Sequence, residues 1–537
     1  MNKIIINSNS LLISAHNAIK QKKYLEAKRI LEKAVTVYPD IFEGNHNLAI
    51  LNLQLGNIDD SIIYFEKSKK IKPNYSKVYF NLAIAYDRAN NLDLSLTNFK
   101  KASQLEPNNS LAYYNIGLIF KKKLELSKAE ENFKISLKLN PNLKLAYTEL
   151  FSLYETSNQL EKYSSLLESA KIIFDDKNLL NYYWGIYYYH KKNYSKSIEL
   201  LENLDLKKEN FHQNLTKHNL LGKCYDRINN FDKAYINFKK NNELVNHYYG
   251  KNIDENIYIK YVNDRINFFK NFEVENWKLS EIKNKSSTPI FLVGFPRSGT
   301  TLLDTIIRTN NTSEVIEEKP ILRNFLQKIE KKMGKDLNKL SDLNENDIYE
   351  MQNFYLNERK VFQKNKRAET VIDKMPLNIA HVGEIVRFFP NAKFILALRN
   401  PYDSVLSCFI QQFTLNPAMK NFLTIESSAL LYDLVMKLWK IYVSKLSINY
   451  HVIKYEDTVQ DFENTTKSLF KFLDLEWTNE IKNFHLTARK RLDISTPSHD
   501  QVISPLYTRS LSRWKNYEKQ FEGVKKILNT WVEEFKY

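Results

Sequence analysis

Apolar residues along the first 245 positions recur with the spacing of amphipathic helices, and this pattern itself repeats every 34 residues. The repeat is marked by a leucine or isoleucine, a small residue, a phenylalanine and a closing proline. The positions in phase are Leu48, Leu82 and Ile116; Ala49, Ala83 and Gly117; Phe65, Phe99 and Phe133; and Pro39, Pro73, Pro107 and Pro141. Stacked helix pairs produce such a period, so the pattern predicts a right-handed helical superhelix.

This order of small, aromatic and proline positions resembles the tetratricopeptide repeat (TPR). Clear repeats cover residues 8–143 and 216–243, with divergent copies between them, so we expect a TPR superhelix over residues 8–245. Its concave groove would suit a peptide or protein partner. Asn47, Asn81 and Asn115 repeat in phase, and they either bind such a partner or satisfy local hydrogen bonds. Residues 246–287 are expected to form a helical linker before a second domain over residues 288–537.

The hydrophobic pattern changes at PIFLVGFPRSGTT, where a short apolar run precedes a glycine-bounded loop. Residues 290–293 are expected to form a buried strand, Gly294 and Gly299 bound the loop, and a helix is expected from Thr300. Backbone N–H groups of such a loop, together with the helix N-terminus, bind a phosphate-like anion. Thr300 stands where nucleotide-hydrolysing loops have a lysine, and Arg297 lies inside the loop instead. This argues against an ATPase or a kinase.

A second strand-and-turn motif, AKFILALRNPYDSVLSCF, follows about a hundred residues later. Residues 395–398 are expected to form a buried parallel strand that ends at Arg399, with a helix from Pro401 and Ser407 within it. A kinase or ATPase would place a magnesium-binding carboxylate at such a strand end, whereas an arginine binds an anion directly.

The string P-R-S-G-T-T and the later motif together resemble sulfotransferases that use 3′-phosphoadenosine 5′-phosphosulfate (PAPS), in particular the tyrosylprotein sulfotransferase branch and bacterial proteins with TPRs before that domain. The resemblance implies an α/β, P-loop-like domain with a central parallel sheet, PAPS as co-substrate, and no metal. It also implies a set of nucleotide-binding residues. These are Arg297, Ser298, Gly299, Thr300, Thr301, Arg399, Ser407, Tyr455, Ser498 and Arg513.

The same resemblance implies a catalytic group of Glu318, Lys374, Arg297 and Ser498. Glu318 is the second member of a Glu-Glu pair 21 residues beyond Arg297, where the tyrosylprotein branch has its catalytic base. Lys374 lies in a D-K-x-P setting, where a lysine would stabilise charge on the leaving oxygen. Without the resemblance, the two segments would be interpreted as a solvated acidic turn and a surface Lys-Asp pair.

The sequence departs from the family pattern at several positions. Gln411 stands where some relatives have a further arginine, and Arg513 stands where the family has lysine. Pro320 and Asn324 occupy positions at which the tyrosylprotein branch has arginines that hold acidic peptides. The acceptor hydroxyl therefore stays open between a protein tyrosine, a saccharide and a small alcohol. The alternative is a TPR adaptor with a degenerate, non-catalytic nucleotide-binding domain.

Charge and composition add little to this picture. The net charge of +17 permits anionic partners, but the lysines are spread along the whole chain, and we expect no nucleic-acid surface. Cys224 and Cys408 are isolated from each other and from histidine clusters, so we expect neither a disulfide framework nor a structural metal site. No apolar run is long enough to span a membrane, and we expect a cytoplasmic protein.

Overall fold

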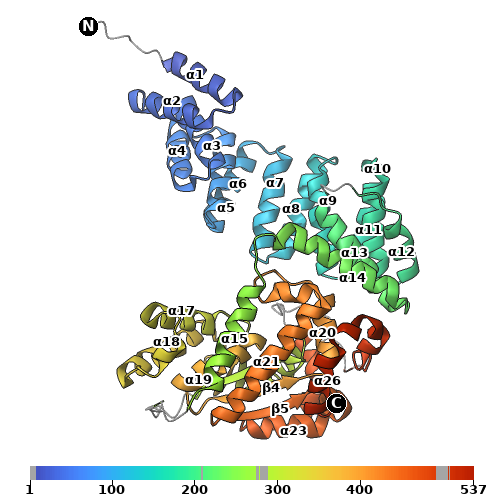
Figure 1. Cartoon of the computed structure of the whole chain (residues 1–537). Helices are drawn as coiled ribbons and strands as arrows, with labels where there is room; N and C mark the ends of the chain where they lie inside the picture. Colours follow the sequence, from blue (N-terminus) through green and yellow to red (C-terminus); the bar gives the residue numbers. More distant parts are fainter. Residues whose placement is uncertain (1–7, 207–209, 274–276, 278–287, 491–505, 507) are drawn as a thin grey trace. The chain divides into compact units, whose positions relative to one another are not determined.

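The computed structural model describes residues 8–206, 210–273, 277, 288–490, 506 and 508–537. The chain divides into two compact units, residues 1–206 and residues 207–537, and each is described by itself (Figure 1). The end of the TPR superhelix at residue 245 and the end of the linker at residue 287 stay predictions.

The first unit consists of paired antiparallel helices. Its described helices are α1 (Ser8–Lys20), α2 (Tyr24–Val37), α3 (Phe42–Gln54), α4 (Ile58–Ile71), α5 (Ser76–Arg88), α6 (Leu92–Leu105), α7 (Ser110–Lys122), α8 (Leu126–Leu139), α9 (Lys144–Thr156), α10 (Leu160–Ile173), α11 (Lys177–His190) and α12 (Tyr194–Glu202). The second helix of each pair, from α2 to α12, begins 34 residues after the previous one. The period therefore continues through the stretch in which its sequence signature is weak.

The in-phase small and aromatic residues are the packing contact within each helix pair. A Cβ atom added to Gly117 of α7 would lie 2.6 Å from Cε1 of Phe133 in α8, so the phenylalanine fills the space that the small residue leaves. Asn115 donates from Nδ2 to the carbonyl of Leu111 in its own helix at 2.8 Å, which agrees with a local role for this side chain.

The second unit begins with one more helix pair and continues into an α/β domain. Its described helices are α13 (Phe211–Arg227), α14 (Phe231–Val245), η1 (Asn246–Gly250), α15 (Asn256–Lys270), α16 (Thr300–Ile307), α17 (Ile321–Met333), η4 (Leu337–Leu340), α18 (Glu345–Phe362), η5 (Pro376–His381), α19 (Val382–Phe388), α20 (Pro401–Ile410), η6 (Met419–Leu423), α21 (Ile425–Lys445), α22 (Tyr455–Gln460), α23 (Phe462–Phe472), η7 (Asn479–Asn483), α24 (Phe484–Lys490), η8 (Arg513–Val524) and α26 (Lys525–Glu534). A Cβ atom added to Gly222 of α13 would lie 2.6 Å from Cδ1 of Phe238 in α14, as close as the corresponding pair in the first unit. This pair is therefore packed as a repeat, although it lies in the second unit.

The described strands form one parallel sheet in the order β2-β3-β1-β4-β5. The strands are β1 (Ile290–Gly294), β2 (Ser313–Glu317), β3 (Thr370–Lys374), β4 (Lys393–Leu398) and β5 (Asn449–Lys454). After β1 the chain goes first to one side of the sheet and later to the other, so the order reverses between β1 and β4. In open parallel sheets, ligands bind beyond the carboxyl ends of the strands at such a point.

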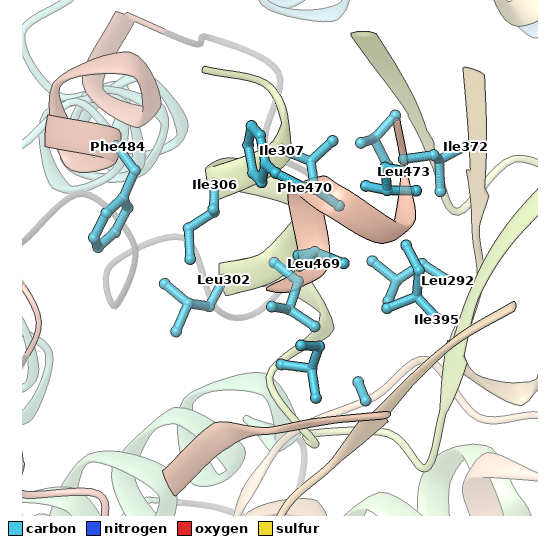
Figure 2. Packing of buried hydrophobic residues seen from close by; sticks show 14 of the residues in the cluster. Leu292, Leu302, Ile306, Ile307, Ile372, Ile395, Leu469, Phe470, Leu473 and Phe484 are labelled. Carbon is cyan, nitrogen blue, oxygen red and sulfur yellow. The ribbon is translucent and has the colours of Figure 1, made fainter. Parts of the chain in front are cut away.

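Helices α16 and α23 cover one face of this sheet with aliphatic and aromatic side chains (Figure 2). The buried residues that meet there include Leu302, Ile306, Ile307, Leu469, Phe470, Leu292, Ile372 and Ile395. Alternate strand residues point to the opposite face, where Phe291 and Phe394 stack with ring centroids 5.6 Å apart. Because both faces are covered at the centre of the sheet, β1 and β4 are buried beyond their first residues, whereas the edge strand β5 is largely exposed.

Candidate functional site

The loop between β1 and α16 has the backbone geometry of an anion-binding turn. It enters the left-handed region at Arg297 (φ 69°) and at Gly299 (φ 95°), directly before the helix. Ser298 is buried, and its Oγ has no hydrogen-bond partner among the described residues. Thr300 and Thr301 are buried in the first turn of α16. A helix N-terminus combined with an unsatisfied buried hydroxyl is suited to a phosphate or sulfate group.

Arg399, the residue that follows β4, lies directly against this loop. Its Nη1 donates to the carbonyl oxygen of Arg297 at 3.3 Å, and its Nη2 donates to the carbonyl oxygen of Ser510 at 2.6 Å. Arg297 in turn donates from Nε to Oγ of Ser407, on α20, at 3.0 Å. The two predicted anion-binding motifs therefore form one group of residues. Nε of Arg399 is buried without a partner among the described residues, so the guanidinium retains a donor for a ligand.

Tyr455, the first residue of α22, packs against both Arg399 and the loop. The guanidinium carbon of Arg399 lies 4.9 Å from the centroid of its ring, and its hydroxyl lies 2.6 Å from Oγ of Ser510. A Cβ atom on Gly299 would lie 2.9 Å from Cδ2 of this ring. Only glycine fits at that position, both for space and for backbone conformation.

Lys374 and Glu318 meet at the carboxyl edge of the sheet, where Lys374 ends β3, two positions from β4, and Glu318 follows β2, three positions from β4. Lys374 is the last residue of β3 and is paired in register with Glu317 of β2 on one side and Leu292 of β1 on the other. Its Nζ lies 2.8 Å from Oε1 of Glu318 and 3.3 Å from Oε1 of Glu317. Glu318 has φ 49°, and its N–H donates to the carbonyl oxygen of Lys374 at 2.8 Å. The ammonium is fully buried, whereas the Glu318 side chain is 35% exposed.

Two further carboxyl groups, those of Asp403 and Glu456, lie close to Arg399 in surroundings that favour their neutral form. Burial raises the pKa of Asp403 and of Glu456, and the charge of Arg399 opposes this effect at both. Glu456 accepts from the N–H of Asn400 at 2.9 Å, and Asp403 accepts from the N–H of Trp514 at 2.9 Å. These groups fix the turns around Arg399.

The remaining predicted residues are in the C-terminal region. Ser498 lies outside the described residues. Arg513, predicted to contact the nucleotide, is bound to Asp226 of α13, with Nη2 2.8 Å from Oδ1. Sequence reasoning did not identify Glu317 as a partner of Lys374, nor Ser510 as the residue between Arg399 and Tyr455. The Glu-Glu pair in the sequence was a signal for the contact of Glu317 with Lys374. Nothing in the local pattern indicates the position of Ser510.

Among the described residues, no group of three or more histidine, cysteine, aspartate or glutamate side chains is arranged to hold a metal ion. Within the same part of the chain, no helix has both the length and the apolar character needed to cross a membrane.

Comparison with known proteins accounts for both halves of the chain. Residues 289–479 match the model of the sulfotransferase family, and residues 42–75 and 76–109 match tetratricopeptide repeats. The chain carries TPRs followed by a sulfotransferase-family domain. The predicted resemblance and the predicted fold class are thereby confirmed.

Relatives of this TPR-containing chain are distant. An uncharacterized protein from Aquifex aeolicus is 26% identical over 321 residues, which are 58% of this chain and 40% of that protein. Protein-tyrosine sulfotransferase 1 from Danio rerio is 24% identical over 249 residues, 45% of this chain and 69% of that enzyme. A tetratricopeptide repeat protein of known structure from Parabacteroides merdae is 15% identical, with a TM-score of 0.35, over 44% of this chain and 93% of that one. The chain thus spans 40% of the length of the Aquifex relative.

Proposed function

We propose that this protein is a PAPS-dependent sulfotransferase that transfers a sulfuryl group to an acceptor hydroxyl. The observation that carries the proposal is the position of Arg399, which donates to the carbonyl oxygen of Arg297 at 3.3 Å and so joins two anion-binding motifs at one edge of the sheet. A nucleotide with phosphate groups at both its 3′ and 5′ positions has anions at the two ends of one nucleoside, and it would need two such motifs in one site.

The described residues fit this donor. The loop amides, Ser298 and Arg297 would hold the 5′ end, where Oγ of Ser298 is buried and unsatisfied. Arg399 and Ser407 would hold the 3′-phosphate, and Nε of Arg399 is likewise buried without a partner among the described residues. Tyr455 would lie beside the nucleoside, since its ring closes the space above Gly299. Thr300 and Thr301 would contribute from the first turn of α16.

The chemistry assigned to the protein residues follows from their charges. PAPS supplies an activated sulfuryl group on its 5′-phosphate. Glu318, which is partly exposed, would accept the proton of the acceptor hydroxyl as the new oxygen–sulfur bond forms. The sulfur–oxygen bond to the 5′-phosphate breaks, and its electron pair stays on the phosphate oxygen. Lys374 and Arg297 would stabilise that developing charge, with Ser498 assigned to the same role by resemblance alone.

The acceptor and its recruitment are also part of the proposal. A protein tyrosine, a saccharide or a small alcohol would each present the hydroxyl that this base requires. Asn324, at a position where the tyrosylprotein branch has an arginine, donates to Oε2 of Glu358 at 2.7 Å. The TPR groove would recruit a peptide or protein partner, and the protein would act in the cytoplasm.

The test is a transfer assay with radiolabelled PAPS and a panel of tyrosine peptides, saccharides and alcohols. We expect Glu318→Gln and Lys374→Ala to lower the transfer rate about 10²-fold or more while nucleotide binding persists. Glu369→Gln is the matched control, because Glu369 is exposed one residue before β3. Wild-type turnover by Glu318→Gln would refute the role of the base. Nucleotide binding without transfer to any acceptor would favour the adaptor alternative.

A further inference from the structure

A buried carboxylate from the last helix pair binds the C-terminal segment of the second unit. Asp226, near the end of α13, is only 5% exposed. Its Oδ1 accepts from Nε of Arg513 at 3.2 Å and from the hydroxyl of Tyr517 at 2.7 Å, and its Oδ2 lies 3.4 Å from Nη2 of Arg509. Three side chains within nine residues of the C-terminal segment therefore converge on one acidic group. We refer to residues 508–517 as the C-terminal clasp.

The same clasp also contacts the candidate nucleotide site. The carbonyl oxygen of Ser510 accepts from Nη2 of Arg399 at 2.6 Å, and Oγ of Ser510 lies 2.6 Å from the hydroxyl of Tyr455. Ser510 thus lies between the two residues assigned to the 3′-phosphate and the nucleoside. A second attachment follows four residues later, where Trp514 stacks on Tyr402 of α20 with ring centroids 4.1 Å apart.

We propose that Asp226 is a positioning residue for the nucleotide site, and that α13 thereby supports this site from outside it. This role rests on the proposed function, because it assigns Arg399 and Tyr455 to the nucleotide. Asp226 does not touch the site itself. It acts through the clasp, which holds Ser510 where its carbonyl oxygen orients the guanidinium of Arg399.

The electrostatics of the contact explain why a carboxylate is needed. Burial is the largest influence on the pKa of Arg513 and lowers it, but the charge of Asp226, together with Tyr517 and the hydrogen bonds to both residues, raises this pKa overall. Without Asp226, the guanidinium of Arg513, whose side chain is 29% exposed, would lose its counter-charge. The clasp would then shift so that Arg513 becomes more exposed to water, and Ser510 would shift with it.

The last helix pair has other contacts to the α/β domain that do not depend on Asp226. Asn242 of α14 donates from Nδ2 to the carbonyl oxygen of Phe409, at 2.9 Å. Tyr235 stacks on the ring of Phe409 at 5.4 Å. A substitution at Asp226 is therefore expected to change the clasp and the nucleotide site while the helix pair stays docked.

The experiment is calorimetric titration of the full chain with adenosine 3′,5′-bisphosphate. We expect Asp226→Asn to weaken binding about tenfold, because it removes the charge but keeps the shape and one acceptor. Tyr517→Phe removes a single donor and should weaken binding about threefold. Asp232→Asn is the matched control, since Asp232 is exposed in the first turn of α14. Thermal unfolding of each variant shows that it is folded at the temperature of the titration.

The transfer assay separates positioning from a general loss of structure. We expect Asp226→Asn to raise the KM for PAPS while the KM for the acceptor stays unchanged. Equal nucleotide affinity in the wild type, Asp226→Asn and Tyr517→Phe would overturn the positioning role alone. A wild-type chain that does not bind the nucleotide would refute the proposed function, and the positioning role would fail with it. If Asp226→Asn does not fold, the affinity of Tyr517→Phe decides the question.

Discussion

The buried ion pair between α15 and α19 provides the sharpest test of how the second unit is held together. Arg265 donates from Nε to Oε1 of Glu384 at 3.0 Å, and the two side chains are only 8% and 3% exposed. The guanidinium also lies over the ring of Tyr261, with its carbon 3.4 Å from the centroid. Because α15 belongs to the predicted linker, this pair ties that segment to the α/β domain. We expect Arg265→Met to destabilise the second unit strongly.

The expected loss of unfolding free energy follows from the pKa of the Glu384 carboxyl group. Burial alone would raise the pKa of Glu384, but the charge of Arg265, with help from His381, outweighs it and lowers the pKa from 4.5 to about 2. At about 1.4 kcal/mol per pKa unit this corresponds to about 3 kcal/mol. Breaking a buried pair by removing one partner typically costs about 3–5 kcal/mol, which agrees. Since the folded-state pKa is depressed, this stability is present above pH 4.5 and is lost as the pH falls toward about 2.

Urea denaturation followed by tryptophan fluorescence measures the effect, since five of the six tryptophans lie in residues 207–537. At pH 7 we expect Arg265→Met to lower the free energy of unfolding by about 3 kcal/mol. The difference from the wild type should shrink as the pH falls, because burial without Arg265 raises the pKa of Glu384 above 4.5 and the carboxyl is neutralised there in the variant, and because the wild type loses its own stabilisation between pH 4.5 and about 2. Lys260→Met is the control on the same helix, because Lys260 is 76% exposed and its pair with Asp264 is a surface pair. Equal stability of the two variants would refute the reasoning.

Two further predictions concern the edge of the sheet. Burial raises the pKa of Asp373 from 3.8 to about 7, so its ionisation destabilises the fold increasingly as the pH rises through this interval. Asp373→Asn, which keeps an acceptor for the hydroxyl of Tyr355, should therefore gain about 2 kcal/mol more in unfolding free energy at pH 8 than at pH 5, and an equal gain at both would contradict this. Gly299→Ala should weaken adenosine 3′,5′-bisphosphate binding about tenfold or more, because its Cβ would lie 2.9 Å from the ring of Tyr455 at φ 95°. Gly334→Ala has a similar φ of 77° in open space and should leave the titrated affinity unchanged.

The helix pairs keep their 34-residue period even where the characteristic residues of the repeat are missing from the sequence. The closing proline is absent after Pro141, yet helices still begin at Leu160 and Tyr194, 34 residues apart. What persists is the contact between a small residue and a large one, as at Gly185, where an added Cβ would lie 2.5 Å from Cδ2 of Leu201. The sequence could predict these helices because the contact is made within one repeat.

The positions of the glycine-bounded turn and of Arg399 were predictable for a related reason. A glycine-bounded turn and an arginine at a strand end are local features, and parallel strands bring such ends to one edge. The ion pair of Lys374 with Glu317 and Glu318 depends on register between strands more than 50 positions apart, which local patterns do not determine. The link from Asp226 to Arg513 joins residues almost 290 positions apart and depends on how the last helix pair packs.

The surroundings of Arg399 and Lys374 differ in a way that supports the separate roles proposed for them. Arg399 is oriented by two carbonyl oxygens and an aromatic ring, and the two carboxyl groups near it, Asp403 and Glu456, have pKa values that burial raises. Lys374 instead lies against the carboxyl groups of Glu317 and Glu318. Under the proposed function, the 3′-phosphate would bind on the β4 side, where Nε of Arg399 is buried without a partner among the described residues. Glu318, which follows β2, would accept the hydroxyl proton at the other end of the same sheet edge.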